Sequence, residues 1–163
     1  MTQSVPEWNL PWHGACRCGA VTLRIGAPPI LTMACHCRGC QKMTGGAFSL
    51  SVAIPEAGFA AEGATPVRGG ARTEGQNHMH CPECLSWIFT TFDAPYGFVN
   101  VRATMLDEAA QLAPFVETQT DEKLPFVHLD TPLSFPRFPD MDEIGEASRR
   151  YADEAPRPGP RET

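Results

Sequence analysis

Seven cysteines in three tight groups constrain this chain more than any other feature of its 163 residues. Their spacings are C-x-C, C-x-C-x-x-C and C-x-x-C. The groups are Cys16 and Cys18; Cys35, Cys37 and Cys40; and Cys81 and Cys84. An odd number of cysteines, crowded at such spacings in a chain that we expect in a reducing compartment, indicates metal binding or catalysis rather than disulfides.

The first and third groups together supply four thiolates, enough to close a tetrahedral zinc site. A C-x-C pair in a strand presents two sulfur atoms on one face, and a C-x-x-C pair does so by folding into a knuckle. Zinc there would add folding energy to a small core. The alternative is a group of buried thiols without metal. The residues of the predicted structural zinc site are Cys16, Cys18, Cys81 and Cys84.

The middle group has three thiolates, and no cysteine is left to complete it. Three protein ligands and an exchangeable fourth position are typical of catalytic zinc. The alternative is a second structural site completed by a histidine, for which the candidates are His36, His78 and His80. We predict a catalytic zinc at Cys35, Cys37 and Cys40, and therefore two zinc ions per chain.

A zinc ion held by three thiolates carries a net charge of about −1 and is a poorer Lewis acid toward water than zinc held by three histidines. Such a soft site suits a further thiolate as its fourth ligand. The middle group therefore favours a thiol substrate over hydrolysis.

Several neighbours of the cysteines have alternative explanations. His36 is expected to be an ordinary surface histidine, with a proton shuttle as the alternative. Gln41, Lys42 and Thr44 follow the middle group and are candidate substrate contacts, although Lys42 can equally be a solvated lysine. Redox use of Cys81 and Cys84 in the manner of thioredoxin requires a following helix, whereas the next residues have a strand pattern.

Four segments have the alternation of apolar and polar residues that is typical of half-buried strands. They are residues 21–25, 47–54, 86–92 and 98–106. Residues 106–115 have the pattern of one or two helical turns, and residues 141–153 that of a short helix. The sequence thus predicts a mainly β protein of antiparallel sheets, cross-linked by the structural zinc.

One domain fits this length. We expect a lead-in over residues 1–12, a zinc-binding β domain over 13–140, and a tail over 141–163 that is partly helical or disordered. The lead-in lacks the basic and apolar regions of a secretion signal, and no stretch approaches a membrane span.

The net charge of −6, with no basic cluster longer than two residues, argues against a nucleic-acid partner. We expect a cytoplasmic protein that binds no membrane. The sequence leaves the oligomeric state open.

The motifs "GACRCGAV", "CHCRGCQKMTGGAFS" and "CPEC" resemble the glutathione-dependent formaldehyde-activating enzyme family, which includes centromere protein V domains. The resemblance spans roughly residues 13–107. It implies a β-tent fold with two zinc sites, one structural and one catalytic, divided among the cysteines as above. Two positions depart from the family pattern, which usually has glycine at Leu85 and at Ala103.

The resemblance also implies an activity: a carbon–sulfur lyase that interconverts glutathione plus formaldehyde and S-hydroxymethylglutathione. A small thiol such as glutathione would then be the partner. Two alternatives remain open, a zinc-stabilised binding module without catalysis and a protein that handles thiols or metal ions. The basic extension expected of a centromere-binding protein is absent from this sequence.

Overall fold

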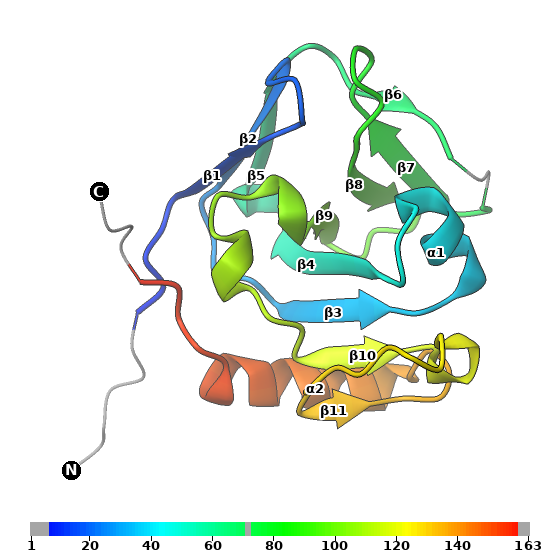
Figure 1. Ribbon diagram of the computed structural model, residues 1–163. Helices are drawn as coiled ribbons and strands as arrows, with labels where there is room; N and C mark the ends of the chain where they lie inside the picture. The colour runs from blue at the N-terminus through cyan, green and yellow to red at the C-terminus, as the bar shows by residue number, and fades with distance from the viewer. Residues whose placement is uncertain (1–6, 71–72, 160–163) are drawn as a thin grey trace.

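The computed structural model describes residues 7–70 and 73–159, and it contains two β-sheets (Figure 1). The small sheet has the order β1-β2-β5, and the large one the order β11-β10-β3-β4-β9-β8-β7-β6. The small sheet consists of β1 (Trp12–Ala15), β2 (Val21–Ile25) and β5 (Phe59–Gly63). The large sheet consists of β3 (Leu31–Cys35), β4 (Ser49–Pro55), β6 (Val67–Arg68), β7 (Gln76–His80), β8 (Trp87–Phe92), β9 (Phe98–Arg102), β10 (Val116–Thr118) and β11 (Leu133–Ser134).

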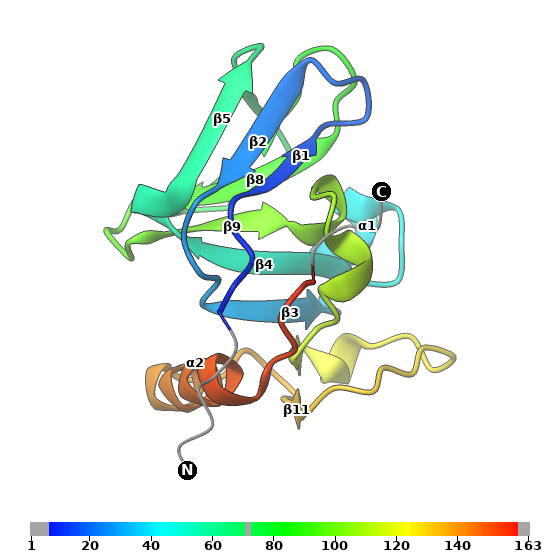
Figure 2. The ribbon, with the colours of Figure 1, turned by 90° about the vertical axis from the view of Figure 1, so that its left-hand side faces the viewer.

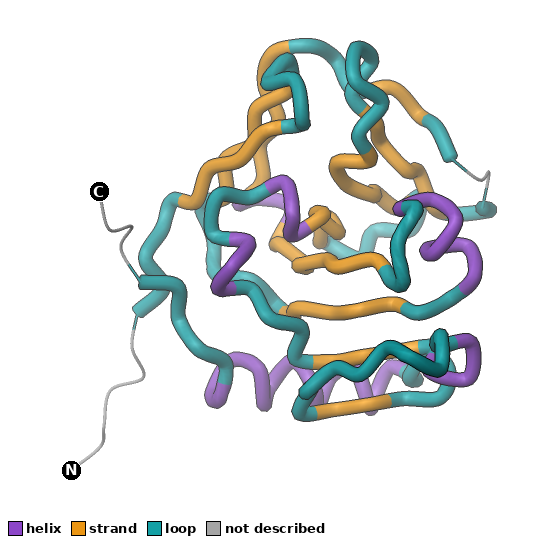
Figure 3. The backbone as a smooth tube through the Cα atoms, in the orientation of Figure 1, coloured by secondary structure: helices purple, strands orange, loops and turns teal. Residues whose placement is uncertain are grey.

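Strands and loops make up most of the described chain (Figure 3). Its α-helices are α1 (Arg38–Thr44), beside the end of β3, and α2 (Met141–Glu154), which lies against β10 and β11 in Figure 1. Short 3-10 segments lie at Glu56–Gly58, Ala103–Met105, Ala109–Gln111 and Thr120–Glu122. The predicted mainly β class is confirmed.

The strongest alternation in the sequence gives the clearest strand. Val21, Leu23 and Ile25 of β2 are buried, and the two residues between them are exposed. β4 ends at Pro55, as predicted. The strand predicted for residues 98–106 is too long, because β9 ends at Arg102 and a 3-10 turn follows.

The predicted antiparallel pairing holds for most of the large sheet, which is mixed at one edge. β10 pairs in parallel with β3 on one side and with β11 on the other. A parallel neighbour requires a long connection. The chain joins β10 to β11 through residues 119–132, which include the 3-10 turn Thr120–Glu122, and it reaches β10 from β3 only after passing through β4 to β9.

The two sheets enclose the main hydrophobic core. β2 supplies Val21, Leu23 and Ile25, and β4 supplies Val52 and Ile54. Figure 2 shows the small sheet rising from one side of the large sheet, so that the two faces converge. The β1–β2 and β7–β8 turns lie together at the top of Figure 1, which places two distant parts of the sequence side by side.

A second apolar cluster lies between β3, β10 and α2. It contains Leu31 and Val116 from the strands and Ala147 and Tyr151 from the helix. α2 begins with a capping box, in which Asp140 accepts from the Glu143 N–H and the Glu143 side chain accepts from the Asp140 N–H. The predicted tail of residues 141–163 therefore contains a helix that packs on the sheet as far as the structure describes it; the domain boundaries remain a prediction.

The predicted lead-in overlaps the start of the folded region. Trp12 begins β1 and is 1% exposed, and Trp8 stacks on Tyr151 at 5.8 Å between ring centroids. β1 also approaches the turn after β9 so closely that a Cβ on Gly14 would lie 2.2 Å from the Met105 carbonyl oxygen. Residues 1–6 of the lead-in lie outside the described residues. Neither described helix is long and apolar enough to cross a membrane.

Candidate metal centres

The first candidate centre joins two turns that belong to different sheets. Cys16 and Cys18 lie in the turn between β1 and β2, and Cys81 and Cys84 lie in the turn between β7 and β8. The spacing predicted that the C-x-C pair lies on a strand, but both cysteines lie in a turn between strands. Gly19 has a φ of +80° and its N–H donates to the Cys16 carbonyl at 3.0 Å, so a tight turn brings both sulfur atoms to one side before β2 begins.

The sulfur atoms of this four-cysteine cluster all lie within 4.8 Å of one another. Two measured separations are 3.6 Å, between Cys16 and Cys18, and 3.7 Å, between Cys18 and Cys81. A zinc ion with Zn–S bonds of about 2.3 Å in a tetrahedron requires S···S separations of about 3.8 Å. The cluster thus has the donor set and the spacing to hold such an ion.

A backbone N–H and a hydroxyl group contact these sulfur atoms. The Val21 N–H donates to the Cys16 sulfur at 3.3 Å, and the Ser86 hydroxyl lies 3.2 Å from the Cys84 sulfur. The Ser86 contact is the main cause that lowers the pKa of Cys84 to about 5. Because the thiolate is the form that binds a metal ion, a thiol with a lowered pKa is a better ligand near neutral pH.

The knuckle that carries Cys81 and Cys84 closes with a strained residue. The Leu85 N–H donates to the Cys81 carbonyl at 3.0 Å, and Leu85 has a φ of +59°. Its side chain is 69% exposed and so gains little from burial. The left-handed region favours glycine, so the knuckle keeps its shape here without the residue that fits it best.

The second candidate centre lies where β3 passes into α1. Cys35 is the last residue of β3, Cys37 caps the N-terminus of α1, and Cys40 lies in its first turn. The Cys40 N–H donates to the Cys37 sulfur at 3.2 Å. The three sulfur atoms lie within 4.8 Å of one another, and no histidine or carboxylate of residues 7–70 and 73–159 joins this three-cysteine cluster.

Proton affinities within the three-cysteine cluster are strongly uneven. The hydrogen bond from the Cys40 thiol is the largest cause that lowers the pKa of Cys35 to about 5. The same contact raises the pKa of Cys40, and burial raises that of Cys37. The first proton therefore leaves easily and the next ones do not, unless a cation arrives to compensate the accumulating negative charge.

The expectation of a surface histidine at position 36 is wrong. His36 is 0% exposed, and its Nε2 lies 2.9 Å from a Glu117 carboxylate oxygen. The same oxygen accepts from the Lys123 ammonium at 2.8 Å. Although burial opposes it, these two partners lower the pKa of Glu117. The side chain between Cys35 and Cys37 is thus fixed on β10 rather than free in solvent.

The predicted substrate contacts have defined structural positions. The Gln41 amide is buried and donates to the His36 carbonyl at 2.7 Å and to the Glu122 carbonyl at 3.0 Å. The Thr44 hydroxyl donates to the Cys40 carbonyl at 2.9 Å and accepts from the Gly46 N–H at 3.2 Å. Both side chains thereby stabilise α1, whereas Lys42 is exposed in its last turn.

Sequence reasoning missed one charged residue near the three-cysteine cluster. Arg102, at the end of β9, is 5% exposed, and its guanidinium carbon lies 4.0 Å from the centroid of the Trp87 ring. An arginine at the end of a half-buried strand is usually solvated, so its position in the sequence gave no signal.

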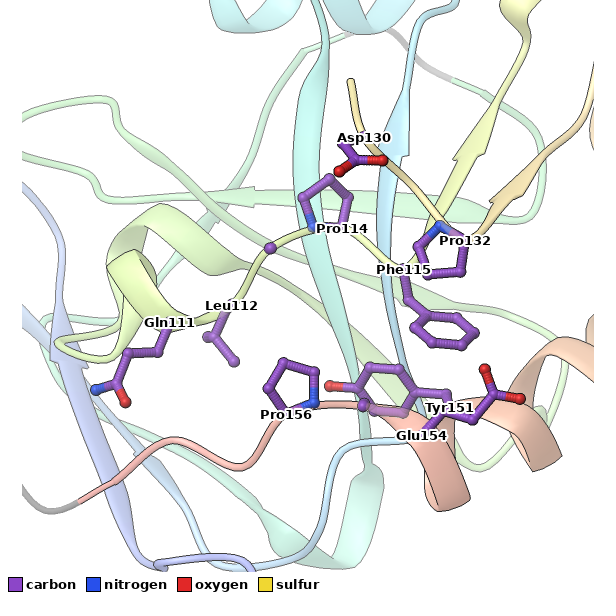
Figure 4. Close-up of a pocket in the computed structure, with 11 residues that line it drawn as sticks. Gln111, Leu112, Pro114, Phe115, Asp130, Pro132, Tyr151, Glu154 and Pro156 are labelled. Carbon is purple, nitrogen blue, oxygen red and sulfur yellow. The ribbon is translucent and has the colours of Figure 1, made fainter. Parts of the chain in front are cut away.

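The hollow drawn in Figure 4 is separate from both clusters. It measures about 190 Å³ and lies between the segment 111–115 and the C-terminal end of α2, where Phe115, Tyr151 and Pro156 line it. None of its lining residues is a cysteine. The chemistry suggested by the cysteines therefore belongs to the sulfur clusters and not to this hollow.

Comparison with known families decides what kind of chain this is. A family model described as glutathione-dependent formaldehyde-activating enzyme matches residues 11–122. The chain belongs to this family. The matched range contains both cysteine clusters and Arg102, and it ends before α2. Membership connects the chain with glutathione-dependent formaldehyde activation in general.

Comparisons with individual proteins add less. Among curated proteins, none matches this chain. A crystal structure of a Rhodobacter sphaeroides protein matches over 58% of this chain and 87% of that one, with 16% sequence identity and a TM-score of 0.45.

Proposed function

We propose that this family member is a zinc-dependent carbon–sulfur lyase that interconverts a thiol plus an aldehyde and their adduct. Glutathione and formaldehyde, which give S-hydroxymethylglutathione, are the proposed pair. The observation that supports the proposal is the three-cysteine cluster, since three sulfur atoms lie together and no described protein group stands as a fourth ligand. A zinc site of that composition has a position for an exchangeable ligand.

In this proposal the two clusters have different roles. Cys16, Cys18, Cys81 and Cys84 hold a structural zinc that links the two sheets, and Cys35, Cys37 and Cys40 hold the catalytic one. The donor sets fit, because thiolates are the ligands that zinc prefers in such closed or three-thiolate sites. When bound at the three-cysteine cluster, zinc would supply the positive charge that keeps a substrate thiol deprotonated near neutral pH.

The proposed reaction is a reversible addition. The substrate sulfur forms a bond to the carbonyl carbon, the π electrons of the C=O bond move to oxygen, and that oxygen takes up one proton. In the reverse direction the adduct loses the proton and the S–C bond breaks. The protein contributes by holding α1 in place through Gln41 and Thr44, which fixes Cys37 and Cys40 relative to Cys35.

Lys42 is the proposed residue of this group that attracts a substrate carboxylate, because its ammonium lies exposed at the end of α1. Gln41 and Thr44, predicted as contacts, are proposed to act mainly through the position of that helix. We further propose a cytoplasmic location, since free thiols and glutathione both require a reducing compartment.

The test is to measure the exchange between S-hydroxymethylglutathione and its components by NMR, with zinc-loaded protein. Wild type should accelerate the exchange above the spontaneous rate, and Cys35→Ser should not. A Cys35→Ser protein that retains one zinc ion and the wild-type circular dichroism spectrum would be the proper control for folding. Wild-type protein with two zinc ions and no acceleration would contradict this substrate pair.

A further inference from the structure

Arg102 carries a buried charge whose N–H groups have no acceptor among the described residues. Its side chain is 5% exposed, and its guanidinium makes no hydrogen bond and no ion pair with residues 7–70 and 73–159. Its Nε atom is fully buried and unbonded. Burying a charge without a partner is costly, and such groups are normally paired or placed to bind a ligand.

The strand register places this guanidinium on the same face as the three-cysteine cluster. Cys35 of β3 lies opposite Ser49 of β4, and Arg102 of β9 lies opposite Ser51. Residues two apart in a strand share a face, and so do directly paired residues. Cys35, Ser49, Ser51 and Arg102 therefore share one face of the sheet. Both serines are buried, at 2% and 4% exposure.

The guanidinium of Arg102 is close enough to the three-cysteine cluster to interact with the charges of its thiolates. Burial lowers the pKa of Arg102 to about 10, while the negative charges of Cys40 and Cys35 oppose that decrease. The group is therefore a cation at neutral pH. Trp87 covers one face of the guanidinium, with 4.0 Å between its carbon and the ring centroid, which fixes the orientation of its plane. The N–H groups at the edge of that plane stay available.

A guanidinium edge with available N–H groups matches a carboxylate, which accepts two parallel hydrogen bonds from it. β4 separates β3 from β9, and Arg102 is offset from Cys35 by two residues along the strands, so their backbones are about 12 Å apart. That separation suits an acid group several bonds away from a sulfur atom held at the cysteines.

We propose that Arg102 binds a carboxylate of the thiol substrate beside the three-cysteine cluster, so that it selects thiols that carry an acid group. This inference rests on the proposed function, because it assigns the thiol to that cluster. Arg102 is a specificity residue in this scheme, and Trp87 positions it. Neither residue was among the sequence candidates for substrate binding, which all lie in α1.

Calorimetric binding to the zinc-loaded protein tests the inference without any turnover. The probes are S-methylglutathione, whose sulfur is blocked, and its dimethyl ester, which lacks both carboxylates. Wild type should bind the acid at least about tenfold more tightly than the ester, a difference of about 1.4 kcal/mol. Arg102→Met should lose most of this preference and keep only the part that Lys42 supplies, and Arg102→Lys should keep more of it.

Thermal unfolding of the same variants excludes a purely structural role. Replacing a buried, unpaired charge by an apolar side chain of similar length leaves stability unchanged or raises it. Arg102→Met should therefore have the wild-type melting temperature or a higher one. A lower melting temperature with an unchanged preference for the acid would overturn the inference and make Arg102 a scaffold residue.

Kinetics separate this inference from the proposed activity. With Arg102→Met, the KM for glutathione should rise about tenfold or more, and the KM for cysteamine, which has no carboxylate, should not change. Equal losses with both thiols would overturn the inference, because Arg102 would then act on the reacting oxygen. If wild type shows no activity with either thiol yet prefers the acid probe, the proposed reaction fails and the carboxylate site remains.

Discussion

The two cysteine clusters have the same sulfur chemistry and nearly the same compactness, yet their surroundings differ. The four-cysteine cluster is built from two turns, one from each sheet. The three-cysteine cluster is built from a strand end and a short helix, with the buried cation of Arg102 on the same sheet face. The first arrangement connects distant parts of the chain, whereas the second places charge around a local site.

This difference suggests how cysteines in one chain can have two roles, linking the two sheets in one cluster and binding an exchangeable ligand in the other. A cluster that bridges two sheets loses its geometry when either turn moves, so its metal would be bound as tightly as the fold itself is stable. A cluster contained within about six consecutive residues keeps its geometry regardless of the other sheet. It can exchange a ligand without opening the core.

The largest expected effect comes from breaking one cluster at a time. Cys81 is 0% exposed and part of the main core, so Cys81→Ser should lower the free energy of unfolding by about 3 kcal/mol or more and release one zinc ion. Cys37→Ser keeps a good helix cap, because serine also accepts from the N–H of the third helical residue. It should cost less than about 1 kcal/mol and abolish activity. Urea denaturation and elemental analysis measure both variants, and equal losses of stability would remove the distinction between the clusters.

The next effect concerns the buried Glu117 carboxylate of β10, which contacts His36 of the three-cysteine segment and the Lys123 ammonium. Glu117→Gln leaves His36 and Lys123 without their negative partner and should lower the free energy of unfolding by about 2 kcal/mol at pH 7. The four-cysteine cluster should keep its zinc in this variant.

The same variant should change the acid limb of stability. The pKa of Glu117 is lowered from 4.5 in the folded protein, so the carboxylate stabilises the fold above about pH 4.5. This contribution is lost as the pH falls through the lowered folded-state pKa. Wild type should therefore lose its advantage over Glu117→Gln below pH 4.5, as measured by melting temperature against pH. Parallel curves down to pH 3 would contradict the ionic role of Glu117.

Chelator competition sharpens the comparison further. Zinc held by the four-cysteine cluster should leave at least about ten times more slowly than zinc held by the three-cysteine cluster, a difference of about 1.4 kcal/mol in barrier. A colorimetric chelator added to protein with two zinc ions should give two phases, and Cys35→Ser should lose the fast one. Release of both zinc ions in one slow phase would favour a zinc-stabilised binding module instead of an enzyme.

The sequence alone predicted the features that depend on residues close together in the chain. The alternation in residues 21–25, the strand ending at Pro55, and the grouping of the cysteines into sets of four and three were all visible in the residue order. β7 was not predicted, because its residues, QNHMH, are mostly polar and their burial comes from the neighbouring strands.

The features missed around the three-cysteine cluster depend on distant residues. The burial of His36 requires Glu117, which is 81 positions away and reaches β3 only through a parallel pairing. The burial of Arg102 requires Trp87 and the pairing of β9 with β4. A single sequence contains the residues of such long-range polar contacts but no local signal of which partner each one has.

The smallest expected effect concerns the knuckle of the four-cysteine cluster. Leu85 is exposed and has a φ of +59°, which costs a leucine about 1 kcal/mol relative to glycine. Leu85→Gly relieves this strain but gives the unfolded chain more freedom, a loss of about 0.5–1 kcal/mol. The free energy of unfolding should therefore stay the same or rise by less than about 1 kcal/mol. Urea denaturation measures this, with Leu85→Ala as the control that keeps the strain. If Leu85→Gly is less stable than Leu85→Ala, the strain at this φ is smaller than the freedom that glycine gives the unfolded chain, which would contradict the strain assigned to this position.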